Sequence, residues 1–550
     1  MKFSFQKPLV AGLCLLSAMI LPACSRAGDV AAGKQAFEAG CSLCHDNSPA
    51  QARYQGPPLF GVAGRPVGAV KDFGYSEALK AAGANGVVWD DKHLDAFLAD
   101  PEKAMPGTTM PVHVADSAKR ENLIAYLKSL TGTVSAGTAK TAQAKANPSF
   151  DWHKDAPGTI HHVTVADLPE PFATDSAGNN AKYVKAEEGF LPNVPEGFTI
   201  SLFASGVDNP RVLRMAPNGD LYVVHTQQGR ISVYRNKGGT LATTPEVFAE
   251  GLPQPFGLAF SGGYAYVANA GSVVRIPMTG GKAQTLVADL ATTSGHSTRD
   301  IVFSKDGQYM YVSVGSESNV AEGMGKPPAN WVETHALGES WGSEAGRALV
   351  LRFKPDGSDR HVMATGIRNC VGLGLKPGTN ELYCTTNERD RLGDDLVPDY
   401  FTQVKDGQFF GWPWYYLGNH EDPRQKGIRP DLAGKVSMPD VLFVSHSAPL
   451  GFVFYDAPKG AKSAFPASYN GSAFVALHGS WNRGPRTGSK VVRVRFENGK
   501  PTGEYEDFMT GLIQDDQQVT GRPVGVAVGP DGALYVSDDA GNKIWRIAPK

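Results

Sequence analysis

One phrase recurs along the C-terminal part of the sequence: a turn with Gly, Asn or Asp, followed by an apolar strand centred on Tyr-Val or a near equivalent. Its copies are centred on Tyr222, Tyr266, Tyr311, Tyr383, Phe474 and Tyr535. The first two spacings are 44 and 45 residues, the length of one four-stranded propeller blade. The later spacings of 72, 91 and 61 residues predict insertions in the loops. Six copies predict an all-β six-bladed β-propeller over residues 191–550, with seven blades as the alternative if residues 440–460 form another.

Length and composition agree with a β-rich chain of more than one domain. The 550 residues indicate two or three domains, and the 63 glycines and 38 prolines favour many turns. Lys and Arg number 53 against 55 Asp and Glu. This near-neutral balance gives no electrostatic case for nucleic-acid binding, so we expect no nucleic-acid partner.

The N-terminus has the pattern of an export signal. Residues 1–23 carry Lys2 and Lys7 and then an apolar run over 9–21, which is short for a membrane span. Residues 21–24, Leu-Pro-Ala-Cys, resemble a bacterial lipoprotein cleavage site, with Cys24 as an acylated first residue that would anchor the protein to a membrane. Ordinary cleavage near Ala27 is the alternative. Both predict an oxidising, periplasm-like compartment.

The stretch Cys41-Ser42-Leu43-Cys44-His45 predicts a covalently attached haem c. Each thiol can add to one vinyl group of the porphyrin, and His45 then ligates the iron. The alternatives are a thioredoxin-like redox pair or half of a zinc site. Neither needs the histidine, and the sequence has no second CxxC motif to complete a zinc site.

The flanking residues predict a small all-α domain over 28–132. We expect helices over 29–39, 92–98 and 120–130, and the motifs CSLCH, GPPLFGVAGRPVG, GYSEAL and PGTTM follow in order. In this order they resemble the mitochondrial-type class I cytochromes c. The resemblance implies that Met110 is the sixth iron ligand, whose thioether raises the iron potential. Met105 precedes the Pro-Gly turn, and we expect it to serve in packing.

Residues 133–190 are expected to join the two domains. The part over 133–149 is rich in Ala, Thr, Gly and Lys and predicts a flexible tether. Residues 150–188 have no clear periodicity and predict an irregular segment packed on one of the domains. His161 and His162 are adjacent and would point apart on a strand, so a metal site there is not favoured.

Polar clusters interrupt the strand pattern of the propeller at four places: 295–300, 366–369, 387–395, and 478–483 with 521–523. A propeller carries its site on loops at one mouth of its channel. The clusters supply a histidine, several arginines and carboxylates. Together they are suited to an anionic cofactor held with a metal.

The same clusters lie in stretches that resemble the glucose/sorbosone dehydrogenases, six-bladed propellers that use pyrroloquinoline quinone (PQQ) with calcium. The stretches are GHSTRDIVFSKDG, GIRNCVGLGL, TNERDRLGDDLVPD, FFGWPWYYLGNHEDPR, HGSWNRG and GRPVGVAVGPDGALYVSDDAGNKIWRI. The resemblance implies that His296 is the general base and that Arg368 stabilises the negative charge arriving with the hydride. It implies PQQ contacts by six further residues: Arg211, Arg299, Asn369, Trp481, Arg483 and Arg522.

The resemblance also implies a calcium site at the main-chain oxygens of Arg389 and Asp390. One departure concerns the position after Arg368 and Asn369, where the family usually has proline and this chain has Cys370. Cys384 lies on the expected neighbouring strand. In an oxidising compartment the two predict a disulfide that braces Arg368 and Asn369, with two buried free thiols as the alternative.

The sequence therefore favours a periplasmic quinohaemoprotein dehydrogenase. A sugar, polyol or related aldehyde would be oxidised at PQQ, and electrons would pass singly through haem c to a downstream cytochrome, quinone or oxidase. Two alternatives belong to other classes: a calcium-dependent propeller hydrolase of the lactonase kind fused to a cytochrome, and a binding or sensory propeller whose haem senses redox state.

Overall fold

The computed structural model describes Met1 and residues 28–131 and 150–550, apart from 43, 50, 52–55, 72, 109, 111, 292–294 and 323. The predicted signal peptide, Cys24, Ala27 and the tether over 133–149 lie outside the described residues. No described helix is long and apolar enough to cross a membrane.

The N-terminal domain is built from helices. They are α1 (Val30–Gly40), α2 (Glu77–Ala84), α3 (Asp91–Ala99), α4 (Pro101–Ala104) and α5 (Ser117–Ser129). Each begins after an Asp or Ser whose side chain accepts hydrogen bonds from first-turn amides. Helices α1 and α5 cross closely because Gly33 has no side chain: a Cβ there would lie 2.0 Å from the carbonyl oxygen of Asn122. The three helices expected from the sequence are thus present.

The second domain is a six-bladed propeller of four-stranded antiparallel sheets, two of which gain a fifth strand at the outer edge. Each Tyr-Val phrase forms the second strand of a blade. From inner to outer strand, the first blade consists of β4 (Leu213–Met215), β5 (Leu221–His225), β6 (Arg230–Tyr234) and β9 (Glu246–Ala249). The second consists of β10 (Pro255–Ser261), β11 (Tyr264–Asn269), β12 (Val273–Pro277) and β13 (Gln284–Val287). The third consists of β14 (Ile301–Phe303), β15 (Met310–Val314), β16 (Leu349–Phe353), β17 (His361–Thr365) and β21 (Gln408–Phe409).

The remaining blades complete the circle. The fourth consists of β18 (Cys370–Leu375), β19 (Leu382–Thr386), β20 (Tyr400–Val404) and β24 (Val441–Leu442). The fifth consists of β25 (Pro449–Phe454), β26 (Ala473–Leu477), β27 (Lys490–Glu497), β28 (Lys500–Met509) and β1 (Ile160–His161). The sixth consists of β30 (Pro523–Val528), β31 (Leu534–Asp538), β32 (Lys543–Pro549) and β3 (Phe198–Ser205). The last blade joins the C-terminal strands to β3, which closes the ring. Residues 440–460 hold the outer strand of one blade and the inner strand of the next, so the alternative of seven blades is wrong.

The long spacings contain small insertions. Helix α6 (Trp331–Thr334) follows β15, and the hairpin of β22 (Tyr415–Tyr416) and β23 (His420–Glu421) follows β21. A second hairpin, β7 (Asn236–Lys237) and β8 (Thr240–Leu241), extends the first blade, and β29 (Gln518–Val519) pairs with β2 (Lys182–Tyr183).

Inner strands of neighbouring blades approach at glycines, and this contact fixes the start of the next blade. A Cβ on Gly257 of β10 would lie 2.4 Å from the carbonyl oxygen of Arg299, and one on Gly525 of β30 would lie 2.6 Å from that of Arg211. Any side chain would push the blades apart. Arg211 and Arg299 each precede the inner strand of a blade, so these contacts also position residues at the channel mouth.

Residues 150–190 run along the propeller as a largely irregular segment, as the sequence predicts. Beyond the pairings of β1 and β2, a buried ion cluster holds the segment: Lys490 Nζ lies 2.7 Å from Asp155 Oδ1 and 2.7 Å from Asp507 Oδ1. His161 Nε2 lies 3.1 Å from the same Asp507 oxygen. A lysine ammonium thus occupies the centre of this Asp-His group, which does not favour a metal site there.

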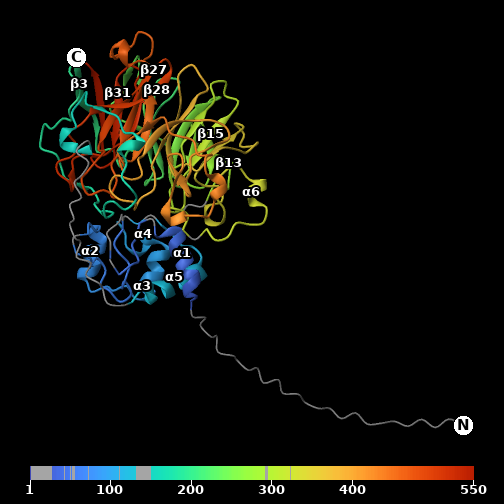
Figure 1. Ribbon diagram of the computed structural model, residues 1–550. Coiled ribbons are helices and arrows are strands. Elements are labelled where there is room, and N and C mark those ends of the chain that lie inside the picture. Colours follow the sequence, from blue (N-terminus) through green and yellow to red (C-terminus); the bar gives the residue numbers. More distant parts are fainter. Residues whose placement is uncertain are drawn as a thin grey trace.

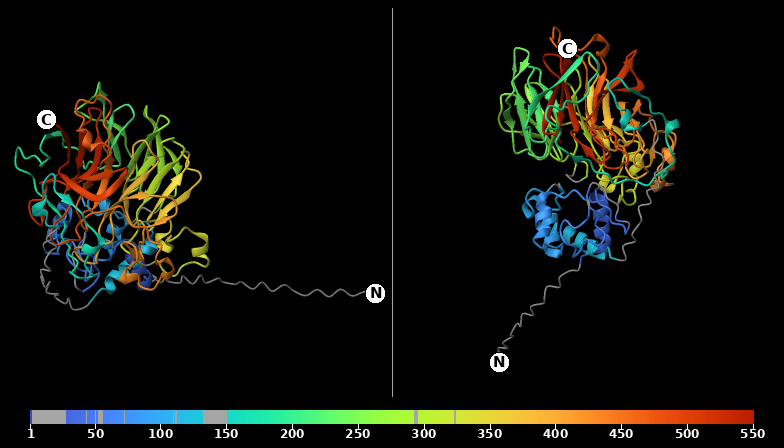
Figure 2. Two further views of the ribbon diagram at one scale, coloured as in Figure 1. Left: turned by 45° about the horizontal axis from the view of Figure 1, so that its top comes forward. Right: turned by 90° about the vertical axis from the view of Figure 1, so that its left-hand side faces the viewer.

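The cytochrome-like domain lies against one end of the propeller (Figure 1), and the views of Figure 2 agree on this arrangement.

Candidate active site

A single cavity of about 700 Å³ extends from the N-terminal domain into the mouth of the propeller. On one side it is lined by the CxxCH motif and the apolar crevice of the helical domain. On the other side it is lined by two kinds of propeller loop: those that lead into the inner strand of a blade and those that follow the second strand. The two candidate redox sites therefore share one cavity.

The crevice side has the residues that covalent haem attachment requires. Cys41, Cys44, His45 and Met110 all line the cavity. Helix α1 ends at the motif, where the amides of Cys44 and His45 donate to the Cys41 carbonyl at 3.1 and 2.9 Å. The surrounding apolar side chains would cover the porphyrin faces. Two thiols, an imidazole and a thioether around an apolar crevice fit haem c.

The orientation of His45 is set by its neighbours. Its Nδ1 lies 2.7 Å from the Pro57 carbonyl oxygen, so the Nδ1 hydrogen is donated there and Nε2 keeps its lone pair for iron. Gly56 makes room for the ring, because a Cβ there would lie 2.3 Å from His45 Cε1. Met105 is not among the residues that line the cavity; it packs behind Leu79 and Phe97, which do line it. The placement favours Met110 as the axial ligand.

The propeller side collects residues that start different blades. Arg211, His296, Arg368 and Arg522 precede β4, β14, β18 and β30, and all four line the cavity. Asn369 and Trp481 line it as well. Because every blade begins its inner strand at the same mouth, residues far apart in sequence meet there.

His296 is held as a neutral imidazole. Its Nδ1 lies 2.9 Å from the carbonyl oxygen and 3.0 Å from the hydroxyl of Ser316. Burial, and then the charge of Arg368, lower the pKa of His296 from 6.5 to about 3. With Nδ1–H donated to the Ser316 carbonyl, Nε2 carries the lone pair. The arrangement suits a general base.

Arg368 is buried and is held by four residues. Its Nε lies 3.2 Å from the carbonyl oxygen of Asn319, and its Nη2 lies 3.1 Å from the Asn319 side-chain oxygen. The other contacts are Nη1 to the carbonyl oxygens of Glu388 at 2.8 Å and Asn387 at 3.4 Å, and Nη2 to Asp390 Oδ2 at 3.2 Å. A fixed positive charge therefore lies beside His296.

A second group of charges lies across the cavity. Arg211 forms an ion pair with Asp539, whose carboxylate also lies 3.0 Å from His478 Nε2. Arg522 Nη2 donates to His478 Nδ1 at 2.8 Å. Burial, and then the charge of Arg522, lower the pKa of His478 to about 4. At neutral pH this group holds two cations and one carboxylate, a surplus of positive charge.

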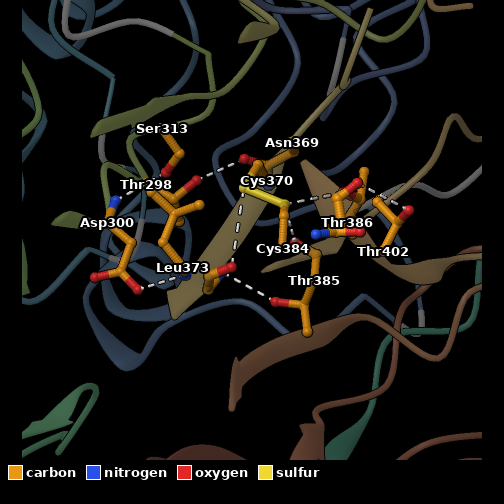
Figure 3. The surroundings of a disulfide bond; sticks show 12 residues. Thr298, Asp300, Ser313, Asn369, Cys370, Leu373, Cys384, Thr385, Thr386 and Thr402 are labelled. Atoms are coloured by element: carbon orange, nitrogen blue, oxygen red, sulfur yellow. Dashed lines mark hydrogen bonds between the residues drawn. A yellow bond between two sulfur atoms is a disulfide. The ribbon is translucent and has the colours of Figure 1, made fainter. Parts of the chain in front are cut away.

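Cys370 and Cys384 form the disulfide expected from the sequence, with Cα atoms 5.8 Å apart (Figure 3). The bridge joins the first two strands of the fourth blade, directly after Asn369. The Asn369 side-chain oxygen accepts a hydrogen bond of 2.6 Å from Thr298, in the loop that carries His296 (Figure 3). The disulfide thus stands at the base of the Arg368–Asn369 turn.

Three arginines named from the resemblance are not among the residues that line the cavity. Arg299 donates at 2.6 Å to the carbonyl oxygen of His296 and so supports the turn of that residue. Arg483 Nη1 lies 2.6 Å from Asp395 Oδ1. Arg389 is fully buried between Glu388 and Asp422. Their side chains brace the loops around the cavity.

The main-chain oxygen of Asp390, one of the two proposed calcium ligands, is engaged by cationic and amide donors. The main-chain oxygen of Asp390 accepts from Asn319 Nδ2 at 3.0 Å and from Arg424 Nη1 at 2.8 Å. The Asp390 carboxylate faces Arg368 and His446. A calcium ion needs several free oxygen atoms and no adjacent cations. The Asp390 oxygens as placed do not fit calcium at this position.

Some residues of the site were not identified from the sequence. The side-chain oxygen of Asn319 accepts hydrogen bonds from Arg368 and, at 2.8 Å, from the Asp390 amide. His446 lines the cavity, with Nδ1 3.4 Å from Asp390 Oδ1. Asn319 follows the second strand of a blade and His446 precedes an inner strand. The polar clusters that were identified from the sequence occupy the same kinds of position, so position was the available signal.

Comparison with known proteins follows the two-part architecture. The TrAA12-like family matches residues 192–400 and 431–550, and the cytochrome c family matches residues 30–131. Cytochrome c2 of Agrobacterium tumefaciens is 42% identical over 101 residues, covering 18% of this chain and 90% of that protein. An uncharacterised protein of Borreliella burgdorferi is 26% identical over 380 residues, covering 64% of this chain and 90% of that protein.

Solved structures show the same propeller fold. The holo form of the pyranose dehydrogenase PQQ domain from Coprinopsis cinerea has a TM-score of 0.53 and 20% identity, covering 66% of this chain and 98% of that chain. The iodide structure of a Trichoderma reesei carbohydrate-active enzyme of family AA12 has a TM-score of 0.53 and 20% identity, covering 68% of this chain and all of that chain (100%). The architecture drawn from the resemblance, a cytochrome c domain joined to a six-bladed propeller, is confirmed. The chain belongs to the TrAA12-like family, with a domain of the cytochrome c family ahead of its propeller.

Proposed function

We propose that the protein is a periplasmic quinohaemoprotein dehydrogenase that oxidises a sugar, a polyol or a related aldehyde and delivers the electrons one at a time to its own haem c. The observation that carries the proposal is the shared cavity, which has a haem-binding motif on one side and a neutral histidine among arginines on the other. A hydrolase would have no use for a haem crevice facing its site.

The propeller side fits PQQ by its charge. PQQ carries three carboxylates, and Arg211, Arg368 and Arg522 all line the cavity with amide donors nearby. When bound, PQQ would accept a hydride from the substrate carbon and so take up two electrons. The solved relative from Coprinopsis cinerea is titled as a PQQ domain of a pyranose dehydrogenase, which supports PQQ as cofactor and a sugar as substrate.

His296 would act as the base. Its Nε2 would accept the proton of the substrate hydroxyl while the hydride leaves the same carbon. Because its Nδ1 hydrogen is donated to Ser316, the ring cannot turn without losing that hydrogen bond. Arg368 would stabilise the negative charge that develops on the acceptor edge, and Arg211 and Arg522 would hold carboxylates of the cofactor. Asn369 and Trp481 would complete the wall.

The haem side would collect the electrons. His45 and Met110 would ligate the iron, and the thioether ligand favours an electron carrier over an oxygen-binding haem. Two equivalents of a one-electron acceptor, such as a cytochrome, a membrane quinone or an oxidase, would then reoxidise the haem in turn. Export by residues 1–23 would place the protein in the periplasm, and acylation of Cys24 would hold it at a membrane.

A cofactor and substrate screen tests the proposal. The purified holo-cytochrome is incubated with PQQ, and then with sugars, polyols, aldehydes and lactones, while an artificial dye and the haem α-band are followed. We expect dye reduction by a sugar-class substrate only when PQQ is present. Lactone hydrolysis without PQQ dependence would support the hydrolase instead, and the absence of both turnover and PQQ binding would contradict an enzymatic role.

A further inference from the structure

The loop after β19 touches both candidate redox sites. Asp390 points into the propeller cavity, where its carboxylate contacts Arg368 and His446. The next residue, Arg391, donates a guanidinium hydrogen bond to the carbonyl oxygen of Ser42. Ser42 lies between the two haem cysteines. One loop therefore contacts the catalytic candidates at one residue and the haem-attachment motif at the next.

The backbone of this loop is held in a defined shape. Arg391 has a φ of 72°, a left-handed conformation that non-glycine residues seldom adopt. Its amide donates at 2.7 Å to the side-chain oxygen of Asn482, which is fully buried. The Asp390 amide is fixed in turn by Asn319. Asn319 and Asn482 thus hold the loop in the turn that places Arg391 at the haem motif.

We infer that Arg391 is a docking residue that seats the haem-attachment loop over the propeller site. This inference rests on the proposed function. Substrate oxidation releases two electrons and two protons. The hydroxyl proton would pass to water through His296, and the hydrogen on the carbon would leave as hydride to the bound cofactor. Reoxidation of the cofactor would release that hydrogen as a proton to water and pass two electrons, one at a time, to the ferric haem, from which a one-electron acceptor removes each in turn.

The docking contact matters because electron transfer slows steeply as two redox groups move apart. A tethered domain without a docking contact samples many orientations, and only a fraction brings the haem edge to the cavity. The Arg391 guanidinium and the Ser42 carbonyl form a directional contact at the motif itself. It selects the orientation in which Cys41 and Cys44 line the shared cavity.

Variants at Arg391 test the inference in the full-length holo-cytochrome. Arg391→Ala removes the donor, and Arg391→Lys keeps a charge but loses the planar fork. Arg495→Ala is the control, because Arg495 is a half-exposed arginine on β27 that pairs with Glu497 and Glu504. One readout is the rate of substrate-driven haem reduction after PQQ loading. The other is hydrogen–deuterium exchange of residues 41–45, which needs neither PQQ nor substrate.

We expect Arg391→Ala to slow substrate-driven haem reduction by roughly tenfold or more, with Arg391→Lys in between and Arg495→Ala unchanged. Exchange at residues 41–45 should rise in Arg391→Ala, while reduction of a small dye by substrate stays near the wild-type rate. Wild-type rates of haem reduction and wild-type protection in both Arg391 variants would overturn the inference. If the wild type oxidises no substrate, the proposed function fails, and the exchange measurement still decides the docking contact.

Discussion

Glu344 is a buried carboxylate that helps to position His296 although it does not line the cavity. Its oxygens accept hydrogen bonds of 2.8 Å from the amides of Glu317 and Ser318 and of 2.6 Å from the Ser318 hydroxyl. These residues follow Ser316, whose carbonyl orients His296. Glu344 is thus a positioning residue for the turn that holds the catalytic candidate.

The titration of Glu344 predicts a pH dependence of stability. Burial raises its pKa from 4.5 to about 7. Between these values the folded state holds a proton that the unfolded state has lost, so stability falls as pH rises and levels off above 7. The share of this residue is on the order of 3 kcal/mol. Calorimetry of Glu344→Gln should show a shallower fall over the same range, and a slope equal to that of the wild type would contradict the assignment.

Gly56 predicts a steric requirement for haem attachment. A Cβ at this position would lie 2.3 Å from the His45 ring, so Gly56→Ala should displace the imidazole and lower the haem content. Lys80→Ala is the control, since Lys80 is an exposed helix residue outside the cavity lining that pairs with Glu77. The α-band absorbance per polypeptide measures the result. Equal haem content in the two variants would show that His45 is not constrained as described.

At the residue scale, the sequence predicted which residues belong to the site better than it predicted which way their side chains point. His296, Arg368, Arg211 and Arg522 line the cavity as expected, because each lies in the loop that leads into an inner strand. Arg299 lies in the His296 loop and Arg483 in the loop after β26, but their side chains are held against other parts of these loops and do not line the cavity. Which way a loop side chain points depends on contacts with other blades, and these are not encoded in local spacing.

The disulfide is the element-scale feature with the clearest energetic consequence. It closes a loop with a sequence separation of 14 between adjacent strands of one blade. Replacing both cysteines by alanine should lower the stability of the propeller by about 3 kcal/mol, since the unfolded chain gains freedom. The melting temperature, compared under matched conditions, measures this loss. A variant that melts with the wild type would mean that the bridge contributes nothing to stability.

Strands and blades were largely predictable because their signal is local and repeated. Each Tyr-Val phrase became a second strand, and the long spacings became insertions such as α6 and the β22–β23 hairpin. The closing strand β3 carries no such phrase, since its partner β32 lies at the other end of the chain. Ring closure pairs the two ends and has no local signature.

At the scale of the whole molecule, the sequence predicted two domains but not their meeting surface. The contact between Arg391 and Ser42 joins residues 349 positions apart, one in each domain. The haem-binding motif and the propeller site, which the sequence predicts separately, line one cavity.

The central claim is that electrons from the substrate reach the haem of the same chain through this cavity. Stopped-flow absorbance of PQQ-loaded protein, mixed with its substrate at several protein concentrations, tests it directly. We predict haem reduction with a rate constant independent of protein concentration, and its loss in His296→Ala while dithionite still reduces the haem. A rate that rises with protein concentration, or an unchanged rate in His296→Ala, would contradict the account.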